Sequence, residues 1–402
     1  MNHIVEKSKC CGCGACFQRC PQKCINLCED IQGFIYPHID EQSCIKCGLC
    51  RKVCPCLNHS KSQFPSASYA AWHEDDEIRL ASSSGGVFSV IAQDMILQGG
   101  VVFGARFNER WEVIHDYTET FDGLAVFRGS KYSQSIIGDN YIMVEQFLKQ
   151  GRKVLFTGTP CQIAGLKIFL KESYDNLLTI DIICHGVPSP LVWRDYLVHL
   201  LTINNNNLYK GIHKFALEKT TKIAKVLFRD KIKGWRNYHF SVFSGSDINE
   251  EKKTIISESY KNNIYMKVYL GNFDLRPICY ECPFKSFSSG SDLTLGDFWG
   301  IEKTYPHLYD ERGVSLVIVN NERGRHALER TMMCLHECKL DDAIAHNKSL
   351  INSPTKPKFY DFFWKRYYSH RIDAIFEIVR KIEPSHLHII ISQIFNKLKI
   401  WK

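Results

Sequence analysis

The 402-residue chain has no apolar stretch of the kind that forms a signal peptide, and no hydrophobic run long enough to span a bilayer. It also lacks the glycine fingerprints of nicotinamide dinucleotide binding, so we expect NADH and NADPH to be poor donors. Its net charge of +8 is spread along the chain rather than gathered in basic clusters, so we expect no nucleic-acid partner. Eighteen cysteines in such a chain are typical of reduced thiols, which predicts a cytoplasmic protein.

One cysteine phrase, C-x2-C-x2-C-x3-C-P, occurs twice near the N-terminus. This run is typical of bacterial ferredoxins that hold two [4Fe–4S] clusters, in which the fourth cysteine of each phrase ligates the neighbouring cluster. A disulfide framework and zinc ribbons are the alternatives, but zinc sites use their four ligands in two pairs. The expected ligand sets are Cys10, Cys13 and Cys16 with Cys54, and Cys44, Cys47 and Cys50 with Cys20.

A polar stretch that contains serine and proline follows the second phrase and predicts a domain boundary near residue 65. Beyond it, helical spacings alternate with apolar runs typical of buried strands. We therefore expect an α+β protein with a ferredoxin-like two-cluster domain followed by a mixed α/β domain. The expected segments are a cluster domain over 1–60, a linker over 61–70, the two parts of the second domain over 71–200 and 201–365, and C-terminal helices over 366–402.

Four further cysteines are candidates for a third cluster. Cys161 and Cys184 each follow a predicted strand, and Cys279 and Cys282 form a C-x2-C pair. Loops at strand ends can converge on one site, but this spacing is equally compatible with zinc or with buried thiols. The remaining six cysteines are interpreted as non-ligands, with one pair on a predicted helix: Cys11, Cys24, Cys28, Cys56, and the helical pair Cys334 and Cys338.

Three glycine-containing phrases predict a pocket for a phosphate or a ring system: a serine–glycine phrase at 82–86, a Gly-Ser-Lys-Tyr phrase at 129–132 and a Gly-Thr-Pro phrase at 158–160. The first precedes an apolar-periodic helix, whose free N–H groups can hold a pyrophosphate, although an ordinary serine cap is the alternative. The second places a cation and an aromatic ring on a turn, and the third follows a strand at its carboxyl end, where α/β sheets bind ligands. Together they favour a dinucleotide pocket. Its predicted residues are Ser83, Ser84, Gly85, Gly86, Gly129, Ser130, Lys131, Tyr132, Gly158 and Thr159.

Phrases along nearly the whole chain resemble the beta subunits of coenzyme F-420 hydrogenase/dehydrogenase. They are SSSGG (82–86), GGVVFGARF (99–107), RGSKYSQS (128–135), FTGTPCQIAGL (156–166), DIICHGVPSP (181–190), FRDKIKGW (228–235), CYECPF (279–284) and LGDFWGIEK (295–303). Members of this family bind FAD, carry an iron–sulfur cluster near the flavin, and in archaeal enzymes exchange a hydride with a deazaflavin. Related plant chlorophyll reductases use the flavin with ferredoxin.

The resemblance implies roles for particular residues. Cys161, Cys184, Cys279 and Cys282 would ligate a cluster next to the flavin. The serine–glycine and Gly-Ser-Lys-Tyr phrases would form part of the FAD site. Gln162 lies in the phrase FTGTPCQIAGL (156–166) and is included in the FAD site. Asp297 would contact flavin or substrate, or else form a turn. His185 is a candidate proton donor, the alternative being a histidine that only makes a hydrogen bond near the cluster.

We expect an FAD-dependent iron–sulfur oxidoreductase that couples hydride transfer at the flavin to one-electron transfer through the clusters. Its partners would be a hydride-carrying small molecule, a deazaflavin or another compound, and an external one-electron carrier. Two alternatives stay open: a ferredoxin-dependent reductase of a biosynthetic small molecule without deazaflavin, and a non-catalytic electron-transfer subunit. The direction of electron flow is also open.

The end of the sequence predicts an amphipathic basic helix. Docking of this helix on the protein's own body and peripheral contact with a membrane surface are both compatible with the pattern. Its apolar residues recur at helical spacing and lysines supply the charge: Leu387, Ile390, Ile391, Ile394, Leu398 and Trp401, with Lys397, Lys399 and Lys402.

The cysteine pattern predicts the metal content. Protein purified anaerobically should hold about 12 irons per chain, from three clusters of four. Serine at both Cys279 and Cys282 should lower iron by about four while leaving the N-terminal pair of clusters intact. Iron and sulfide analysis of the two proteins measures this, and unchanged iron in the variant would show that the two thiols are structural.

Overall fold

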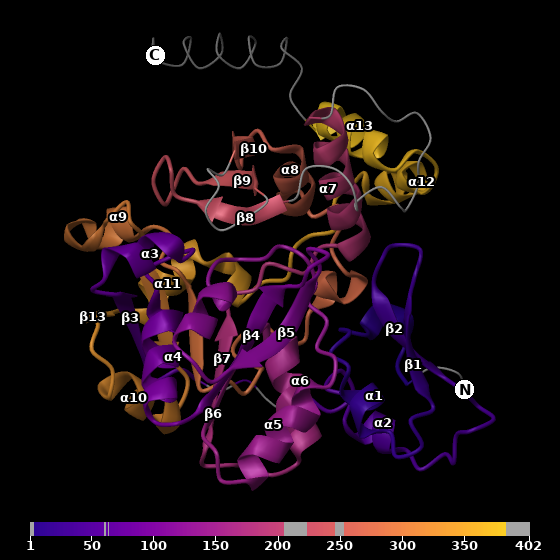
Figure 1. The fold of residues 1–402 in the computed structure, drawn as a ribbon, viewed down its shortest axis with the longest axis horizontal. Helices are drawn as coiled ribbons and strands as arrows, with labels where there is room; N and C mark the ends of the chain where they lie inside the picture. Colours follow the sequence, from indigo (N-terminus) through magenta and orange to yellow (C-terminus); the bar gives the residue numbers. More distant parts are fainter. Residues whose placement is uncertain (1–3, 60–61, 63, 205–222, 246–252, 383–402) are drawn as a thin grey trace, which may run out of the picture.

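The computed structural model describes residues 4–59, 62, 64–204, 223–245 and 253–382. They form three parts, seen in Figure 1: a small cysteine-rich module, a body built on a large sheet, and a smaller sheet packed with helices. The fold is a mixed α/β one with a large mixed sheet, consistent with the α+β class that the sequence predicts. The predicted helix from Leu387 to Lys402 lies outside the described residues.

The two cysteine phrases fold into equivalent short structures. In each, a left-handed glycine, Gly14 (φ 74°) or Gly48 (φ 73°), precedes a short helix that carries the third cysteine of the phrase. Glycine adopts this conformation without strain. Between the copies lies an antiparallel hairpin. The elements are a 3-10 helix (Lys7–Lys9), α1 (Ala15–Arg19), β1 (Ile25–Glu29), β2 (Ile35–Ile39) and α2 (Leu49–Lys52).

The body is built on an eight-stranded sheet. Its strands are β3 (Ala67–Trp72), β4 (Val101–Phe107), β5 (Val113–Thr118), β6 (Val154–Gly158), β7 (Leu177–Ile182), β11 (Leu293–Asp297), β12 (Ser315–Val319) and β13 (Cys334–Cys338). They lie in the order β13-β3-β12-β11-β7-β6-β4-β5. The neighbours β11, β7, β6 and β4 run parallel, and the strands on either side of them pair antiparallel.

Helices cover both faces of this sheet (Figure 1). On β4, Phe103 packs in the same cluster as Tyr141, whereas Val102 packs on the opposite face with Ile91. Because both faces are buried, apolar residues follow one another in these strands without a polar alternation. The helices are α3 (Asp76–Ala81), α4 (Val87–Leu97), α5 (Asn140–Lys149), α6 (Pro160–Leu170), α9 (Ile301–Thr304), α10 (Glu322–Glu329) and α11 (Leu340–His346), with 3-10 helices at Asp122–Phe127, Pro277–Glu281, Pro306–Leu308 and Lys348–Leu350.

A three-stranded antiparallel sheet and four helices form the third part. Its aromatic core surrounds Trp193, whose ring centroid lies 4.9 Å from that of Phe228 and 5.3 Å from that of Tyr265. The Trp193 Nε1 donates a hydrogen bond to the carbonyl oxygen of Trp111 (2.7 Å) and so ties this core to the body. The elements are α7 (Pro190–Asn204), β8 (Ile223–Asp230), β9 (His239–Ser244), β10 (Lys253–Ser259), α8 (Ile264–Leu270), α12 (Tyr360–His370) and α13 (Ile372–Ile382).

The cysteine-rich module packs directly against the body. The side-chain oxygen of Gln18 accepts hydrogen bonds from the backbone N–H groups of Tyr141 and Ile142 (2.9 and 3.1 Å), so the module caps the N-terminus of α5. The hairpin turn at Gly33 touches the start of α7, where an added Cβ atom would lie 2.3 Å from the Cβ of Leu191. The module is therefore part of the packing of the body.

Three expectations from the sequence are corrected here. Residues 67–70, assigned to the linker, form the first part of β3, which pairs with β12 and β13. The boundary expected between residues 365 and 366 falls inside α12. Cys334 and Cys338, expected on a helix, lie in β13, because pairing with β3 outweighs the local spacing.

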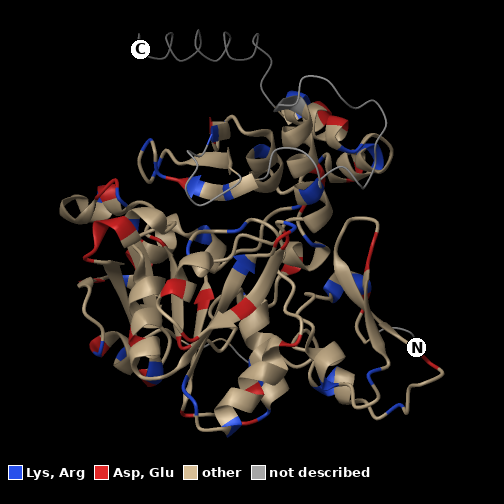
Figure 2. Ribbon diagram, in the orientation of Figure 1, with Lys and Arg blue, Asp and Glu red and all other residues tan. Residues whose placement is uncertain are grey.

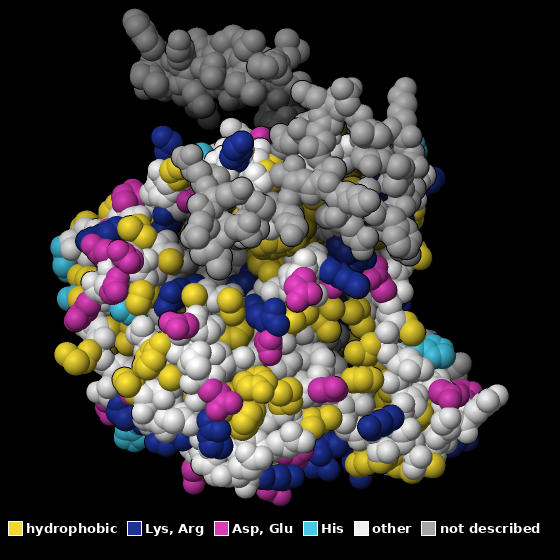
Figure 3. Space-filling model, viewed as in Figure 1, with side chains coloured by type: hydrophobic (Ala, Val, Ile, Leu, Met, Phe, Trp, Pro, Cys, Tyr) yellow, Lys and Arg dark blue, Asp and Glu magenta, His cyan; other side chains and the backbone are white. Residues whose placement is uncertain are grey.

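Within the described residues, no helix combines the length and the apolar character that crossing a bilayer requires. Basic and acidic residues occur in all three parts of the structure (Figure 2), in agreement with the diffuse charge of the sequence. On the face shown in Figure 3, apolar side chains lie scattered among polar ones.

Candidate functional site

The carboxyl ends of the parallel strands open into a cleft with a volume of about 320 Å³. Parallel strands end at the same edge of a sheet, so the loops after β6 and β7 and the end of β11 meet there. Twelve of the thirteen residues predicted to bind cofactor or to act in catalysis line this cleft. They are Ser83, Ser84, Gly86, Gly129, Ser130, Lys131, Tyr132, Gly158, Thr159, Gln162, His185 and Asp297.

The serine–glycine phrase shapes the wall of the cleft at the N-terminus of α4. Gly86 precedes the helix in the left-handed conformation (φ 88°), and no side chain caps the helix. The hydroxyl of Ser83 accepts hydrogen bonds from the backbone N–H and the hydroxyl of Ser130 (2.6 and 2.9 Å), which joins two of the predicted phrases. The alternative of an ordinary serine cap does not hold, and the first turn of α4 offers uncapped N–H groups beside the cleft.

Gly85 is the predicted residue that does not line the cleft. Its N–H donates to the hydroxyl of Ser315 (2.8 Å). An added Cβ atom at Gly85 would lie 2.3 Å from the carbonyl oxygen of Ala71. The glycine is therefore required by the close approach of the chain to β3 and β12, which fixes the position of the α4 N-terminus.

Lys131 lines the cleft, and its ammonium group is bound by the turn that carries it. The Nζ donates to the carbonyl oxygens of Phe127, Arg128 and Gly129 (3.3, 3.0 and 3.0 Å), and burial lowers the pKa of this lysine to about 7. We expected this cation to hold phosphates, but it holds the turn that carries Ser130. The neighbouring Tyr132 stacks on Tyr269 (4.7 Å between ring centroids), and both rings line the cleft.

Asp297 forms an ion pair with Arg229 that is largely buried. Its two oxygens accept from the guanidinium of Arg229 (2.8 and 3.0 Å), and Trp235 Nε1 donates to one of them (2.6 Å). The Arg229 side chain is 4% exposed and lies over the ring of Tyr238. Asp297 therefore holds the small sheet against the end of β11. Asp297 is the last residue of β11, which corrects the expectation of a simple turn. Because it also lines the cleft, its contact with flavin or substrate stays a prediction.

Two residues of the cleft were not found from the sequence. His115 on β5 has its Nε2 atom 3.0 Å from the carbonyl oxygen of Thr157, so Nε2 carries the proton and Nδ1 is an acceptor. Nδ1 is buried and has no partner among the described residues, and burial lowers the pKa of His115 to about 4. Arg128 reaches the cleft beside α4, where its Nε donates to Ser89 (3.0 Å). The position of Arg128, immediately before the Gly-Ser-Lys-Tyr phrase, was the available signal.

The four cysteines of the predicted third cluster line one cavity of about 40 Å³ next to the cleft: Cys161, Cys184, Cys279 and Cys282. Burial raises the pKa of Cys184 to about 12 and that of Cys282 to about 11. Buried thiols of this kind become thiolates when a metal supplies the positive charge, and the donor set therefore fits an iron–sulfur cluster.

His185 lies at the boundary between this cavity and the cleft. Asn272 Nδ2 donates to the carbonyl oxygen of Thr355 (3.1 Å), so its Oδ1 faces His185 Nε2 (2.6 Å) and accepts the proton of that nitrogen. Burial lowers the pKa of His185, which favours the neutral ring. The Nε2 proton is thus held within the protein.

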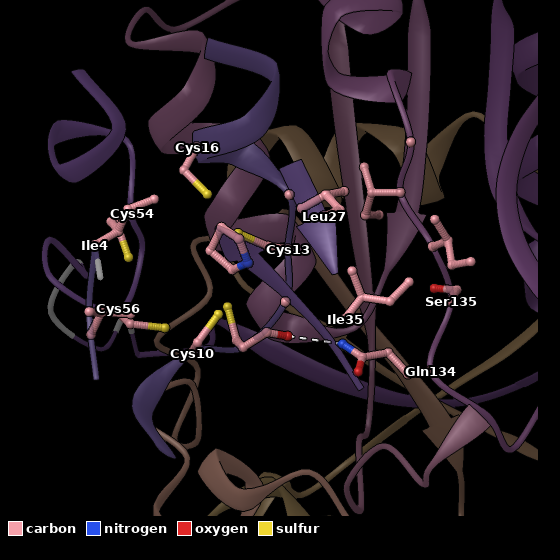
Figure 4. A pocket seen from close by; sticks show the side chains of 18 of the residues that line it. Ile4, Cys10, Cys13, Cys16, Leu27, Ile35, Cys54, Cys56, Gln134 and Ser135 are labelled. Atoms are coloured by element: carbon pink, nitrogen blue, oxygen red, sulfur yellow. Dashed lines mark hydrogen bonds between the residues drawn. The ribbon is translucent and has the colours of Figure 1, made fainter. Parts of the chain in front are cut away.

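We call the first expected ligand set, Cys10, Cys13, Cys16 and Cys54, the inner set, and the second, Cys20, Cys44, Cys47 and Cys50, the outer set. The sulfur atoms of the inner set converge on a cavity of about 50 Å³ (Figure 4). This cavity is lined by all four cysteines of the first expected set and by two expected non-ligands: Cys10, Cys13, Cys16 and Cys54, with Cys11 and Cys56. All eighteen cysteines belong to the described part of the chain and none forms a disulfide. Within that part, His, Cys, Asp and Glu side chains form no group of three that could hold a single metal ion.

The outer set lies closer to solvent. Cys20, Cys44 and Cys50 surround a small core that contains Ile25, and Cys47 is exposed. Burial, together with proximity to Cys20 and Cys44, raises the pKa of Cys24 to about 12. The structure thus separates the two expected sets into one that faces the body and one that faces outward.

Cys11 lies between two of the cavities. It lines both the inner cavity of the module and the cavity of the third set, and its side chain is 4% exposed. Interaction with the thiol of Cys13, together with burial, raises the pKa of Cys11, and its thiol also interacts with those of Cys161 and Cys56. The sequence analysis interpreted Cys11 as a non-ligand, and its position between the two cavities was not expected.

The ion pair of Asp297 predicts a loss of stability. Asp297→Asn leaves Arg229 buried without its counter-charge, which should lower the free energy of unfolding by about 3–5 kcal/mol. Asp116→Asn is the matched control, because its pair with Arg106 is 35% and 30% exposed and should be worth about 0–1 kcal/mol. Denaturant unfolding of both variants measures the difference, and equal stability would contradict the structural role of Asp297.

Residues 151–342 match the family model that describes the C terminus of the beta subunit in coenzyme F420 hydrogenase/dehydrogenase. A coenzyme F420-dependent sulfite reductase of Methanocaldococcus jannaschii is 27% identical over 210 residues, and the chain spans 50% of its own length and 31% of that relative. Among solved structures, the xenon-derivatised F420-reducing [NiFe] hydrogenase complex of Methanosarcina barkeri aligns at 15% identity with a TM-score of 0.43, over 80% of this chain and 92% of that one. The sequence matches show a resemblance of this part of the chain to the coenzyme F420 hydrogenase/dehydrogenase beta subunits.

Proposed function

We propose that the protein is an FAD-dependent iron–sulfur oxidoreductase that joins hydride transfer at the flavin to one-electron transfer through three [4Fe–4S] clusters. The observation that carries the proposal is the continuity of three cavities. Cys184 and His185 line both the cleft and the third cysteine cavity, and Cys11 lines both cysteine cavities. A flavin in the cleft could use such a row of adjacent cluster sites, because a flavin accepts two electrons as a hydride and passes them on one at a time.

The pyrophosphate of FAD fits the wall at the start of α4. Uncapped N–H groups at the N-terminus of an eleven-residue helix attract an anion, and Gly86 precedes this helix in the left-handed conformation. Arg128 adds a guanidinium, of which only Nε is hydrogen-bonded within the described chain. Lys131 acts indirectly, because it fixes the turn that presents Ser130 to Ser83.

The rest of the cleft fits a planar ring. The stacked pair Tyr132 and Tyr269 and the ring of Trp299 supply aromatic walls. The unpartnered Nδ1 of His115 is a buried acceptor that a ring N–H or a ribityl hydroxyl would satisfy. Burial keeps this imidazole neutral and therefore able to accept.

The order of the three cavities in the structure gives the expected route of the electrons. Electrons would pass between the cleft, the third set, the inner set and the outer set, where the exposed Cys47 marks the place for an external one-electron carrier. We propose a deazaflavin as the hydride partner, in line with the F420-dependent relative. Reduced thiols further suggest a reducing compartment such as the cytoplasm.

An anaerobic donor screen tests the proposal. The bound flavin should bleach with reduced deazaflavin and stay oxidised with NADH or NADPH, because the nicotinamide fingerprints are missing. Bleaching only by reduced ferredoxin would favour a ferredoxin-dependent reductase. Clusters that respond to a protein partner while no flavin is bound would favour a pure electron-transfer subunit.

The cleft also predicts the flavin and its affinity. The purified protein should release FAD on denaturation, and Arg128→Gln should raise the dissociation constant about tenfold or more through the loss of a charged donor. Arg110→Gln, at an exposed position of the same domain, is the control and should leave the affinity unchanged. Fluorescence titration of the deflavinated proteins measures both, and full affinity in Arg128→Gln would remove Arg128 from the site.

A further inference from the structure

Arg276 occupies the junction between the cysteine-rich module and the body. It precedes the 3-10 helix Pro277–Glu281, which carries Cys279 of the third set. Its guanidinium is fully buried and donates to the carbonyl oxygens of Cys10 and Ile35 (2.6 and 3.0 Å) and to the side chain of Gln134 (2.8 Å). Gln134 in turn donates to the carbonyl oxygen of Cys11, the hydrogen bond drawn in Figure 4.

The charge of Arg276 has no carboxylate partner within the described part of the chain. Its Nη2 lies 3.6 Å from the Sγ of Cys10, and the guanidinium lies over the rings of Tyr36 and Phe34 (4.2 and 5.4 Å to the centroids). A buried charge without a counter-charge is strongly destabilising. A thiolate-ligated iron–sulfur cluster carries net negative charge and would supply that counter-charge at the inner set.

The two cysteine phrases differ at the positions that receive this arginine. Gly12 (φ 73°) stands between the first two cysteines of the inner phrase, and an added Cβ atom there would lie 2.6 Å from Arg276 Nη1. The equivalent residue of the outer phrase is Lys46, which also has positive φ (54°) and is exposed. The residue before it is Cys11 in the inner phrase and Ile45, 60% exposed, in the outer phrase. Only the inner phrase is shaped to admit a guanidinium.

We propose that Arg276 is a positioning residue that sets the reduction potential of the inner N-terminal cluster. Its fixed positive charge and its hydrogen bonds beside Cys10 stabilise the reduced, more negative cluster and so raise its potential above that of the outer cluster. The proposal rests on the clusters of the proposed function. The step concerned is the transfer of one electron from one cluster to another, and no bond forms or breaks.

Redox titration followed by electron paramagnetic resonance tests this on the full-length protein. In Arg276→Gln, the ratio of reduced to oxidised inner cluster at a fixed solution potential should fall about tenfold, which for one electron is a lowering of about 59 mV. Arg276→Lys keeps the charge and should lie closer to wild type. Arg194→Gln is the matched control, because Arg194 on α7 also bridges to the module, through Glu29, without contacting a cysteine. It should leave the ratio unchanged.

The outcomes separate this proposal from the proposed function. Wild-type protein without cluster signals would refute the proposed function. Wild-type signals with the same potential in Arg276→Gln, or an equal shift in Arg194→Gln, would overturn the role of Arg276 alone. If Arg276→Gln fails to fold, the wild-type protein still tests the proposal. Cys47→Ser identifies the signal of the outer cluster and serine at both Cys279 and Cys282 identifies that of the third cluster, so the remaining signal belongs to the inner cluster and should titrate at a higher potential than that of the outer cluster. The reverse order would overturn the proposal.

Discussion

The parallel pairing of β4, β6, β7 and β11 is the constraint on which the candidate site depends. It turns the ends of strands that are distant in the sequence toward one edge of the sheet, where the first turn of α6 brings Cys161 and the loop after β7 brings Cys184. Glycine at position 85 then lets the α4 N-terminus approach this edge. The parallel pairing therefore places the cleft, the third cysteine set and the surface against which the cysteine-rich module packs.

The duplicated phrase shows how one local structure acquires two environments. The backbone of both copies is nearly the same, with a left-handed glycine before a short helix. The inner copy is packed against α5 and α6, with Cys13 in contact distance of Gly165, whereas the outer copy presents Cys47 to solvent. The surroundings of a cluster, and not its ligands alone, set its reduction potential. If both copies hold the proposed clusters, the different packing of the two copies is sufficient to give the clusters different reduction potentials.

The sequence predicted those features that depend on local spacing. The cysteine phrases, the buried strands and the glycine phrases of the cleft are local patterns, and the structure brings their residues together. The pairing of Arg229 with Asp297 spans 68 positions and leaves no local trace. The role of Lys131 depends on the carbonyl groups that its own turn happens to expose. In the sequence, His115 looks like any residue of a strand that points into the core. Only the structure distinguishes it, because its buried Nδ1 has no hydrogen-bond partner among the described residues.

The core of the cysteine-rich module is formed by few residues, and half of them are cysteines: Ile4, Cys24, Ile25 and Cys54. So small a core cannot hold a domain together without metal or neighbours. Gln18 of this module caps α5, so if the module holds the proposed clusters, iron binding would be coupled to the folding of the body. A chain synthesised during iron shortage would carry an incomplete N-terminal region, and cellular proteases would find their first cleavage sites there.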